Sequence, residues 1–268
     1  MKNNSPQKQL KTKQDVFFNS GKTLDIEQRI ERLKVLKRSI LAHESEIITA
    51  LQHDLAKPEP EIWLAEIHVT LKELKTVIKN LKYWAKPKRV PGKWLNAPSK
   101  DWIVAEPYGL TLHIAPWNYP FQLALNPLIG AVAAGNTVVL KPSEHASKTA
   151  EILNKIISEV FPPEWVAVAQ GGPEVAKELL AQRWDYIFFT GGVSIAKIVA
   201  KAAAEHLTPT TLELGGKNPC IVDHTANITV SARRIVWGKF MNCGQVCMSP
   251  DYVLVHHTKY NELIENLK

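Results

Sequence analysis

A pair of cysteines near the end of the chain stands in a motif whose residue types could carry covalent chemistry. The segment Asn242-Cys-Gly-Gln-Val-Cys247 supplies two thiols four residues apart. No further Cys or His surrounds them at zinc-ligand spacing, so we predict no metal site, and the spacing is wrong for a redox Cys-x-x-Cys pair. A thiolate is a strong nucleophile, and the motifs described below, taken together, favour Cys247 as the candidate covalent catalyst. A buried spectator thiol is the alternative, which we accept for Cys220 and Cys243.

Two other polar side chains are candidates for acid–base and oxyanion chemistry. Glu213 lies in Thr211-Leu-Glu-Leu-Gly-Gly-Lys217, an apolar strand before a Gly-Gly turn. Burial raises the pKa of a carboxyl, which suits a general base near neutral pH; a strand-edge Glu that points into water is the alternative. Asn118, in Pro116-Trp-Asn-Tyr-Pro-Phe121, offers a neutral amide donor to a substrate oxygen. A helix-capping Asn is the competing interpretation.

Two further segments have the chemistry of a nucleotide site. Lys141 and Glu144, in Lys141-Pro-Ser-Glu144, follow an apolar run and can hydrogen-bond the vicinal hydroxyls of a ribose, although a surface ion pair is equally compatible. The segment Phe189-Thr-Gly-Gly-Val-Ser-Ile-Ala196 joins a strand to a helix, where backbone amides can meet a pyrophosphate. It is not the G-x-G-x-x-G fingerprint, and a purely structural turn is the alternative.

The elements that position these motifs fall into two regions. Residues 1–20 are expected to be a flexible tail. Apolar residues at helical spacing then predict two helices, separated by Lys57-Pro-Glu-Pro60 and ending before the proline-containing run from Lys86 to Pro98. The apolar positions of the first helix are Ile26, Ile30, Leu33, Ile40, Ile47 and Leu51, and those of the second are Leu64, Ile67, Leu71, Leu74, Ile78 and Leu81.

After Asp101 short apolar runs alternate with helical ones, which is typical of an α/β protein with a mostly parallel sheet covered on both faces. We expect strands at 110–115, 137–140, 165–169, 186–189, 211–214, 218–222 and 252–256, and helices at 121–134, 173–181 and 230–240. The chain stops at 260–268 in a segment predicted to be a helix. This end indicates a fragment, or final elements that lack the strands they normally pack against.

Composition excludes several classes of protein. Of 268 residues, 45% are hydrophobic and 22% charged, which argues against disordered, collagen-like and disulfide-dense chains. The net charge of +7 comes from the first hundred residues, and no basic stripe interleaved with aromatic residues indicates nucleic-acid binding. The apolar stretch Pro120–Leu140 is interrupted by Asn126, Pro127 and Gly135, so we expect no membrane segment. Few, clustered cysteines favour a reducing compartment, and we expect a cytoplasmic protein.

Each motif is weak alone, but their identity and order resemble the aldehyde dehydrogenase superfamily over nearly the whole chain after Val16. The motifs that carry the resemblance are Pro-Trp-Asn-Tyr-Pro, Lys-Pro-Ser-Glu, Phe-Thr-Gly, Leu-Glu-Leu-Gly-Gly-Lys and Asn-x-Gly-Gln-x-Cys. The short N-terminal region and Met-Asn-Cys-Gly-Gln-Val-Cys look most like the class 3 and fatty-aldehyde branch. One departure is Ala196, which stands where the family's Gly-Ser-Thr-x-x-Gly turn has its last glycine.

The resemblance implies a fold and a division into parts. It implies N-terminal helices followed by a doubly wound, Rossmann-like sheet, with residues 21–210 as the NAD(P)-binding domain. Residues 211–268 would be the incomplete start of a second, catalytic α/β domain, and the chain would be truncated at its C-terminus. A homodimer is implied for a full-length form.

The resemblance also implies a reaction, the oxidation of an aldehyde to a carboxylic acid with NAD or, alternatively, NADP. Cys247 would form a thiohemiacetal and then a thioester, Asn118 with the backbone N–H of Cys247 would hold the oxyanion, and Glu213 would activate water. Cofactor contacts would come from Lys141, Glu144, Thr190, Gly191, Pro116 and Trp117. Two alternatives remain, a truncated non-catalytic nucleotide-binding fragment and an acylating, CoA-dependent aldehyde dehydrogenase, against which Glu213 counts.

Overall fold

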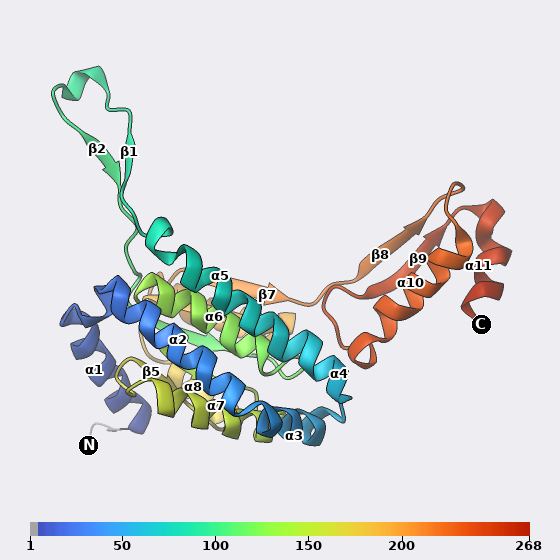
Figure 1. Cartoon of the computed structure of the whole chain (residues 1–268), viewed down its shortest axis with the longest axis horizontal. Helices are drawn as coiled ribbons and strands as arrows, with labels where there is room; N and C mark the ends of the chain where they lie inside the picture. The colour runs from blue at the N-terminus through green and yellow to red at the C-terminus, as the bar shows by residue number, and fades with distance from the viewer. Residues whose placement is uncertain (1–4) are drawn as a thin grey trace.

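The computed structural model describes residues 5–268, which form a large α/β body with two extensions (Figure 1). One extension is a thin antiparallel arm that contains β1 and β2, and the other is a smaller unit that contains β8, β9, α10 and α11. The expected α/β class is confirmed. In residues 5–268 no helix has the length and apolar character needed to cross a bilayer.

The N-terminal region is helical and packs on the body. Its helices are α1 (Pro6–Asn19), α2 (Ile26–Ala42), α3 (Glu44–Leu55), α4 (Glu59–Ile62) and α5 (Val69–Trp84), with a π-helical turn (Trp63–His68) between the last two. The first predicted helix is in fact two, because the chain breaks at His43. The apolar residues expected on one face still meet the same core, in which Leu33, Ile47 and Leu51 are fully buried.

The central sheet is parallel and has five strands in the order β5-β4-β3-β6-β7. The strands are β3 (Leu110–Ile114), β4 (Thr137–Lys141), β5 (Val166–Val168), β6 (Tyr186–Gly191) and β7 (Thr210–Leu214), joined by α6 (Gln122–Ala134), α7 (Ser147–Val160), α8 (Pro173–Leu180) and α9 (Val193–Ala204). The chain runs outward from β3 to β5, then returns to the other side of β3. Ligands of open α/β sheets bind at the carboxyl ends of the strands where the order reverses in this way.

Each face of the sheet carries its own hydrophobic core, which confirms a doubly wound arrangement. Residues of α2, α3, α5, α6 and α7 pack on the face to which Val138 and Leu140 of β4 point. On the opposite face Val139 joins residues of α8 and α9. This alternation along one strand is what a sheet buried on both faces requires.

The structure corrects the expected flexible tail over residues 6–19; residues 1–4 lie outside the described part of the chain. These residues form α1, and Phe17 packs 5.8 Å from the ring of Trp165. Gln14 is fully buried, and its Nε2 donates to the carbonyl oxygens of Val138 (3.0 Å) and Pro163 (3.2 Å). The polar composition of this segment concealed a helix that docks through a few residues.

The antiparallel arm was not expected, since the Lys86–Pro98 run was interpreted only as the end of the helical region. It consists of β1 (Lys88–Val90) and β2 (Asp101–Ile103) and projects away from the body (Figure 1). Large apolar side chains lie exposed along it, namely Trp94, Leu95, Trp102 and Ile103. An exposed apolar arm of this kind is typical of an interaction surface.

The smaller unit pairs β8 (Asn218–Val222) with β9 (Pro250–Val255) in parallel and packs them against α10 (Ile228–Phe240) and α11 (Tyr260–Leu267). Its own core is small, with Val222, Ile228, Ala232 and Leu263 as the buried members. The expected boundary at residue 211 needs correction, because β7 pairs with β6 and belongs to the large sheet. The unit begins after the Gly215–Gly216 turn.

The central strand contains a buried histidine that makes the stability of the fold sensitive to acid. His113 in β3 is 4% exposed, and burial lowers its pKa from the usual 6.5 to about 3. The unfolded chain therefore takes up a proton first, and the free energy of unfolding falls as the pH drops below 6.5 towards 3, by about 1.4 kcal/mol per pH unit.

We expect His113→Leu to flatten this acid-side loss, which urea unfolding at about pH 7 and about pH 5 measures. If the free energy of unfolding falls between the two pH values by the same amount in His113→Leu as in the wild type, His113 is protonated in the folded chain and its pKa is not lowered. His206→Leu, at an exposed histidine after α9, is the matched control.

Candidate functional site

A cleft of about 680 Å³ opens at the carboxyl ends of β3, β6 and β7, where the strand order reverses. It is lined by the loop after β3, the Gly-Gly turns after β6 and β7, and the loop between α10 and β9. The predicted residues that it brings together are Pro116, Trp117, Asn118, Thr190, Gly191, Glu213 and Cys247. Lys141 and Glu144 do not line it.

Cys247 is exposed and faces the cleft at the end of an irregular loop. The loop begins with Asn242 and Cys243, both in the left-handed region (φ 51° and 54°). Left-handed residues other than Gly are strained and persist only where their surroundings hold them. The Nδ2 of Asn218 donates to the carbonyl oxygen of Cys247 at 2.7 Å, so the backbone of the nucleophile candidate is tied to the start of β8.

The two spectator cysteines are less buried than expected. Cys243 is exposed and Cys220 is half-buried. Cys243 lies in the strained turn that leads to Cys247, which places its side chain outside any apolar core.

Asn118 is held with its side-chain amide at the cleft. Its Nδ2 donates to the carbonyl oxygen of Gln245 at 2.8 Å, and its own carbonyl oxygen accepts from Nδ2 of Asn242 at 2.8 Å. The capping alternative is excluded, because α6 begins after Phe121 without a side-chain cap of its own. Among the hydrogen bonds of residues 5–268 the Asn118 amide nitrogen makes this one donation, to Gln245, and an amide nitrogen carries two hydrogens.

Glu213 lines the cleft, but its expected burial is wrong in this chain. Its strand, β7, is the edge of the sheet, and Glu213 is exposed there. Within the described residues nothing is paired with the outer side of β7, so water reaches the carboxylate. Glu213 and Cys247 nevertheless share one cavity although they come from different elements.

Lys141 and Glu144 form an ion pair at the end of β4, one strand away from the cleft. The two side chains are 4% and 33% exposed, and Nζ lies 2.5 Å from Oε2. Burial is the largest single influence and raises the pKa of Glu144, but the hydrogen bond and charge of Lys141 together with a backbone N–H outweigh it, so the pKa is lowered. The pair lies at the carboxyl edge of the sheet, where both side chains could meet ribose hydroxyls.

The turn after β6 fits the phosphates of a dinucleotide. Gly192 is the N-cap of α9 and supplies no side-chain cap, so the first-turn amides of that helix are open to a ligand. A Cβ at Gly192 would meet no atom within 4 Å, which leaves the approach free, whereas one at Gly191 would come within 2.7 Å of the Phe189 ring. Replacement of the family's last glycine by Ala196 leaves a side chain that is buried and tightly packed.

Several residues that hold this cleft together were missed by sequence reasoning. They are Lys57, Glu61, Glu66, Asn218, Asn242 and Gln245, which bond to the loops of Asn118 and Cys247. One signal was available, since Glu66 lies between Leu64 and Ile67 of a predicted apolar stripe. Its partner could not be identified from spacing.

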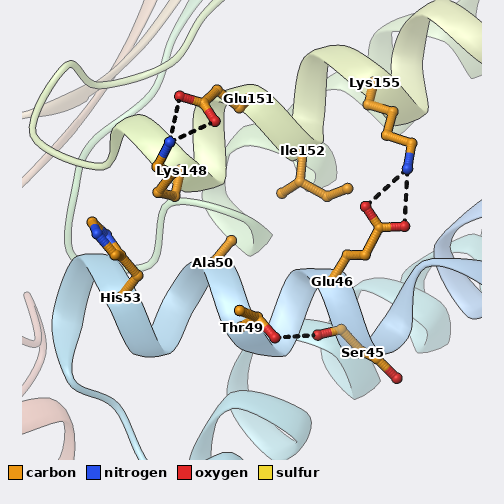
Figure 2. A pocket seen from close by; sticks show the side chains of 9 residues that line it. All are labelled: Ser45, Glu46, Thr49, Ala50, His53, Lys148, Glu151, Ile152 and Lys155. Carbon is orange, nitrogen blue, oxygen red and sulfur yellow. Dashed lines mark hydrogen bonds and ion pairs between the residues drawn. The ribbon is translucent and has the colours of Figure 1, made fainter.

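A second cavity, of about 560 Å³, lies between α3 and α7 and contains none of the predicted site residues (Figure 2). Its charges are matched within it, because Lys155 pairs with Glu46 at 2.8 Å and Lys148 with Glu151 at 3.0 Å. The figure shows Glu46 reaching from α3 towards Lys155 of α7. These contacts are typical of a solvated helix–helix groove.

Comparison with known proteins agrees with the geometry of the first cleft. Residues 11–268 match the aldehyde dehydrogenase family. The chain is 48% identical over 251 residues to the 4,4'-diaponeurosporen-aldehyde dehydrogenase of Staphylococcus aureus, covering 94% of this chain and 55% of the relative. It is 43% identical to a dog protein named "Aldehyde dehydrogenase, dimeric NADP-preferring" and 41% identical to aldehyde dehydrogenase family 3 member A2 of Pongo abelii, again over 94% of this chain and 55% and 52% of the relatives.

Solved structures agree as well. A substrate-bound state of Staphylococcus aureus AldH superposes with a TM-score of 0.95 at 46% identity, over 97% of this chain and 57% of that one. A Mycobacterium tuberculosis aldehyde dehydrogenase complexed with NAD+ superposes with a TM-score of 0.82 at 25% identity, over 89% and 49%. This chain thus spans about half the length of its relatives. The match over residues 11–268 shows that the chain belongs to the aldehyde dehydrogenase family.

Proposed function

We propose that this chain carries the nucleophile and cofactor site of an enzyme that oxidises aldehydes to carboxylic acids with NAD or NADP. The proposal rests on one observation. Cys247, Asn118 and Glu213 line the same cleft, although they come from three separate segments. A nucleophile, an oxyanion donor and a base are the three groups that a covalent acyl transfer needs.

The proposed sequence begins with the thiolate of Cys247, which attacks the carbonyl carbon and converts the C=O double bond into an alkoxide. Nδ2 of Asn118 donates to that oxygen; because Gln245 and Asn242 fix the asparagine beforehand, little reorganisation is needed. When bound, the nicotinamide ring supplies the acceptor for the hydride that leaves the same carbon. The carbon is then a thioester on Cys247. Glu213 takes a proton from water, the water oxygen attacks the thioester carbon, and the C–S bond breaks to release the acid.

The residues that would hold the cofactor lie along the carboxyl edge of the sheet. The turn Thr190–Gly192 and the start of α9 would meet the phosphates, and Lys141 with Glu144 would meet the adenine ribose, with Pro116 and Trp117 beside the nicotinamide end. An acid such as Glu144 favours the free 2′-hydroxyl of NAD. The dog relative is named NADP-preferring, so NADP remains the alternative cofactor.

We propose an apolar aldehyde as the substrate. The cleft is lined, next to the candidate catalytic groups, by apolar side chains, namely Trp117, Leu123, Pro127, Phe188 and Val246. A fatty or aromatic aldehyde is the class that the resemblance to the class 3 branch implies, and one relative is named for 4,4'-diaponeurosporen aldehyde.

Two competing functions remain. An acylating enzyme would pass the acyl group to CoA, which makes a water-activating Glu213 unnecessary. A non-catalytic nucleotide-binding fragment is favoured by the exposure of Glu213.

We expect the full chain with a long-chain aldehyde and NAD to produce reduced cofactor and free acid in equal amounts, with no stimulation by CoA, because Glu213 directs the thioester to water. Absorbance of the reduced cofactor and chromatography of the acid measure this. Acyl-CoA as the product would establish the acylating function, and cofactor binding by calorimetry without turnover would establish the fragment.

We also propose a cytoplasmic location and a homodimer for the full-length enzyme. The three cysteines are free thiols, as expected in a reducing compartment. The exposed apolar arm and the relative named dimeric support the assembly.

A further inference from the structure

A buried ion pair lies behind the cleft and takes no part in the proposed chemistry. Lys57, before α4, and Glu66, in the π-helical turn, place Nζ 2.7 Å from Oε1 with 1% and 0% of their side chains exposed. Desolvation of two buried charges offsets most of the free energy of their attraction, so net stabilisation does not explain this ion pair. The other contacts that each partner makes do explain it.

Glu66 caps the helix that follows Asn118. Its Oε2 accepts the backbone N–H groups of Phe121 (3.2 Å) and Gln122 (2.9 Å), which α6 does not satisfy with a cap of its own. Burial raises the pKa of Glu66, while Lys57 and the two N–H groups act in the opposite direction. A carboxylate far away in sequence thus fixes the start of α6.

Lys57 holds the other side of the same loop. Its Nζ donates to the carbonyl oxygen of Asn118 at 3.4 Å and lies 4.4 Å from the centre of the Tyr119 ring. The ring is itself buried, and burial, with Glu61, Glu66 and Cys247 nearby, raises the pKa of Tyr119 to about 12. Lys57 therefore holds the loop before Pro120, and Glu66 holds it after Pro120.

Glu61, one helical turn before Glu66, reaches the opposite loop. Its Oε1 accepts the backbone N–H of Asn242 at 2.6 Å. Asn242 is 4% exposed, and its Nδ2 donates to the carbonyl oxygens of Asn118 (2.8 Å) and Gln245 (3.3 Å). The same carbonyl of Gln245 accepts from the Asn118 amide. One short helical segment therefore binds both walls of the cleft.

We propose that Lys57, Glu61 and Glu66 are positioning residues, which set the Asn118 amide against the Cys247 loop without touching the reacting atoms. The inference rests on the proposed function. The π-helical turn supports it, because such turns are rare and are frequently found at functional sites. The left-handed Asn242 supports it too, because the bond from its N–H to Glu61 holds a strained residue in place.

The test of the buried pair is the double variant Lys57→Met/Glu66→Met. Replacing both charges by apolar groups leaves no lone buried charge, but the N–H groups of Phe121 and Gln122 lose their acceptor, so the melting temperature is expected to fall by roughly 5 °C and kcat is measured well below it. We expect kcat to fall about tenfold with little change in KM, because the Asn118 amide is misplaced in the transition state. In an Asn118→Ala background the double variant should cause no further loss of kcat.

The matched test of Glu61 uses three single variants. Glu61→Ala removes the acceptor for the Asn242 N–H and is expected to lower kcat several-fold, whereas Glu61→Gln keeps an acceptor oxygen and rescues most of it. Glu59→Ala, an exposed acid on the same short helix, is the control and leaves kcat unchanged. Glu61 is only partly buried, so these variants fold even if the buried pair proves essential for folding.

Amide hydrogen exchange by NMR tests the contacts without any activity. The N–H groups of Phe121 and Gln122 should exchange roughly five- to tenfold faster in Lys57→Met/Glu66→Met, and that of Asn242 in Glu61→Ala, as loss of one hydrogen bond predicts. If these amides respond to the substitutions as expected but the wild-type chain shows no turnover, the proposed function is refuted and the positioning contacts still hold. Unchanged exchange, or additive kcat losses in the Asn118→Ala background, overturns the positioning role.

Discussion

Cys247→Ser in the full chain is expected to abolish aldehyde-dependent formation of reduced cofactor, with kcat falling by on the order of a thousandfold or more because the covalent route is lost. A serine hydroxyl is far less ionised than a thiol near neutral pH, and no residue lining the cleft is a histidine that could deprotonate it. Cofactor binding, measured by calorimetry, should be unaffected, since Cys247 contributes to the chemistry and not to the phosphate sites.

The chain provides a close control for this variant. Cys243 is exposed and lies four residues before Cys247 in the same loop. Cys243→Ser should retain the wild-type kcat within about twofold, as expected for a surface substitution away from the reaction. Equal losses in the two variants would assign the effect to the loop, and retained turnover in Cys247→Ser would remove the nucleophile from the proposal.

Glu213→Gln is expected to separate the two halves of the reaction. The amide is similar in shape but cannot accept a proton from water, so steady-state turnover should fall about a thousandfold. The step that forms the thioester does not use Glu213, so a rapid burst of reduced cofactor, close to one equivalent per Cys247, should remain. Stopped-flow absorbance measures the burst and the slow phase together.

The control for Glu213→Gln is Glu205→Gln, at an exposed acid after α9, which should show the wild-type steady state. A Glu213→Gln variant without a burst would place the carboxylate in the first half of the reaction. If added CoA restored rapid turnover to Glu213→Gln, the acyl group would be reaching a thiol acceptor, as in an acylating enzyme.

The sequence predicts the sheet well because its strands are buried on both faces. Runs such as Leu110–Ala115 and Thr137–Leu140 are mostly apolar and carry no formal charge from Asp, Glu, Lys or Arg, and the structure confirms both to within one residue at one end. The sequence pattern does not predict α7, and it predicts a flexible tail where the structure has α1. In both helices polar side chains separate the residues that pack on the body. That a segment is docked becomes visible only from its contacts, such as the hydrogen bond from Gln14 to the carbonyl oxygen of Val138.

The candidate site was predicted in outline for a geometric reason. Asn118, Thr190 and Glu213 each follow or end a strand, and parallel strands bring such residues to one edge of the sheet. The exposure of Glu213 could not be foreseen, because it depends on β7 being an edge strand. The contacts of Glu66 with residues 121 and 122 span more than fifty positions in sequence, and no local pattern encodes them.

The most direct measurement of the central claim is peptide mapping of the acyl-enzyme. Glu213→Gln protein is mixed with a long-chain aldehyde and NAD, quenched in acid during the slow phase, digested and analysed by mass spectrometry. Our account predicts an acyl group on the peptide at Cys247, in an amount equal to the burst, with Cys220 and Cys243 unmodified. Reduced cofactor formed with the acyl group on another residue, or with no acyl adduct at all, would contradict it.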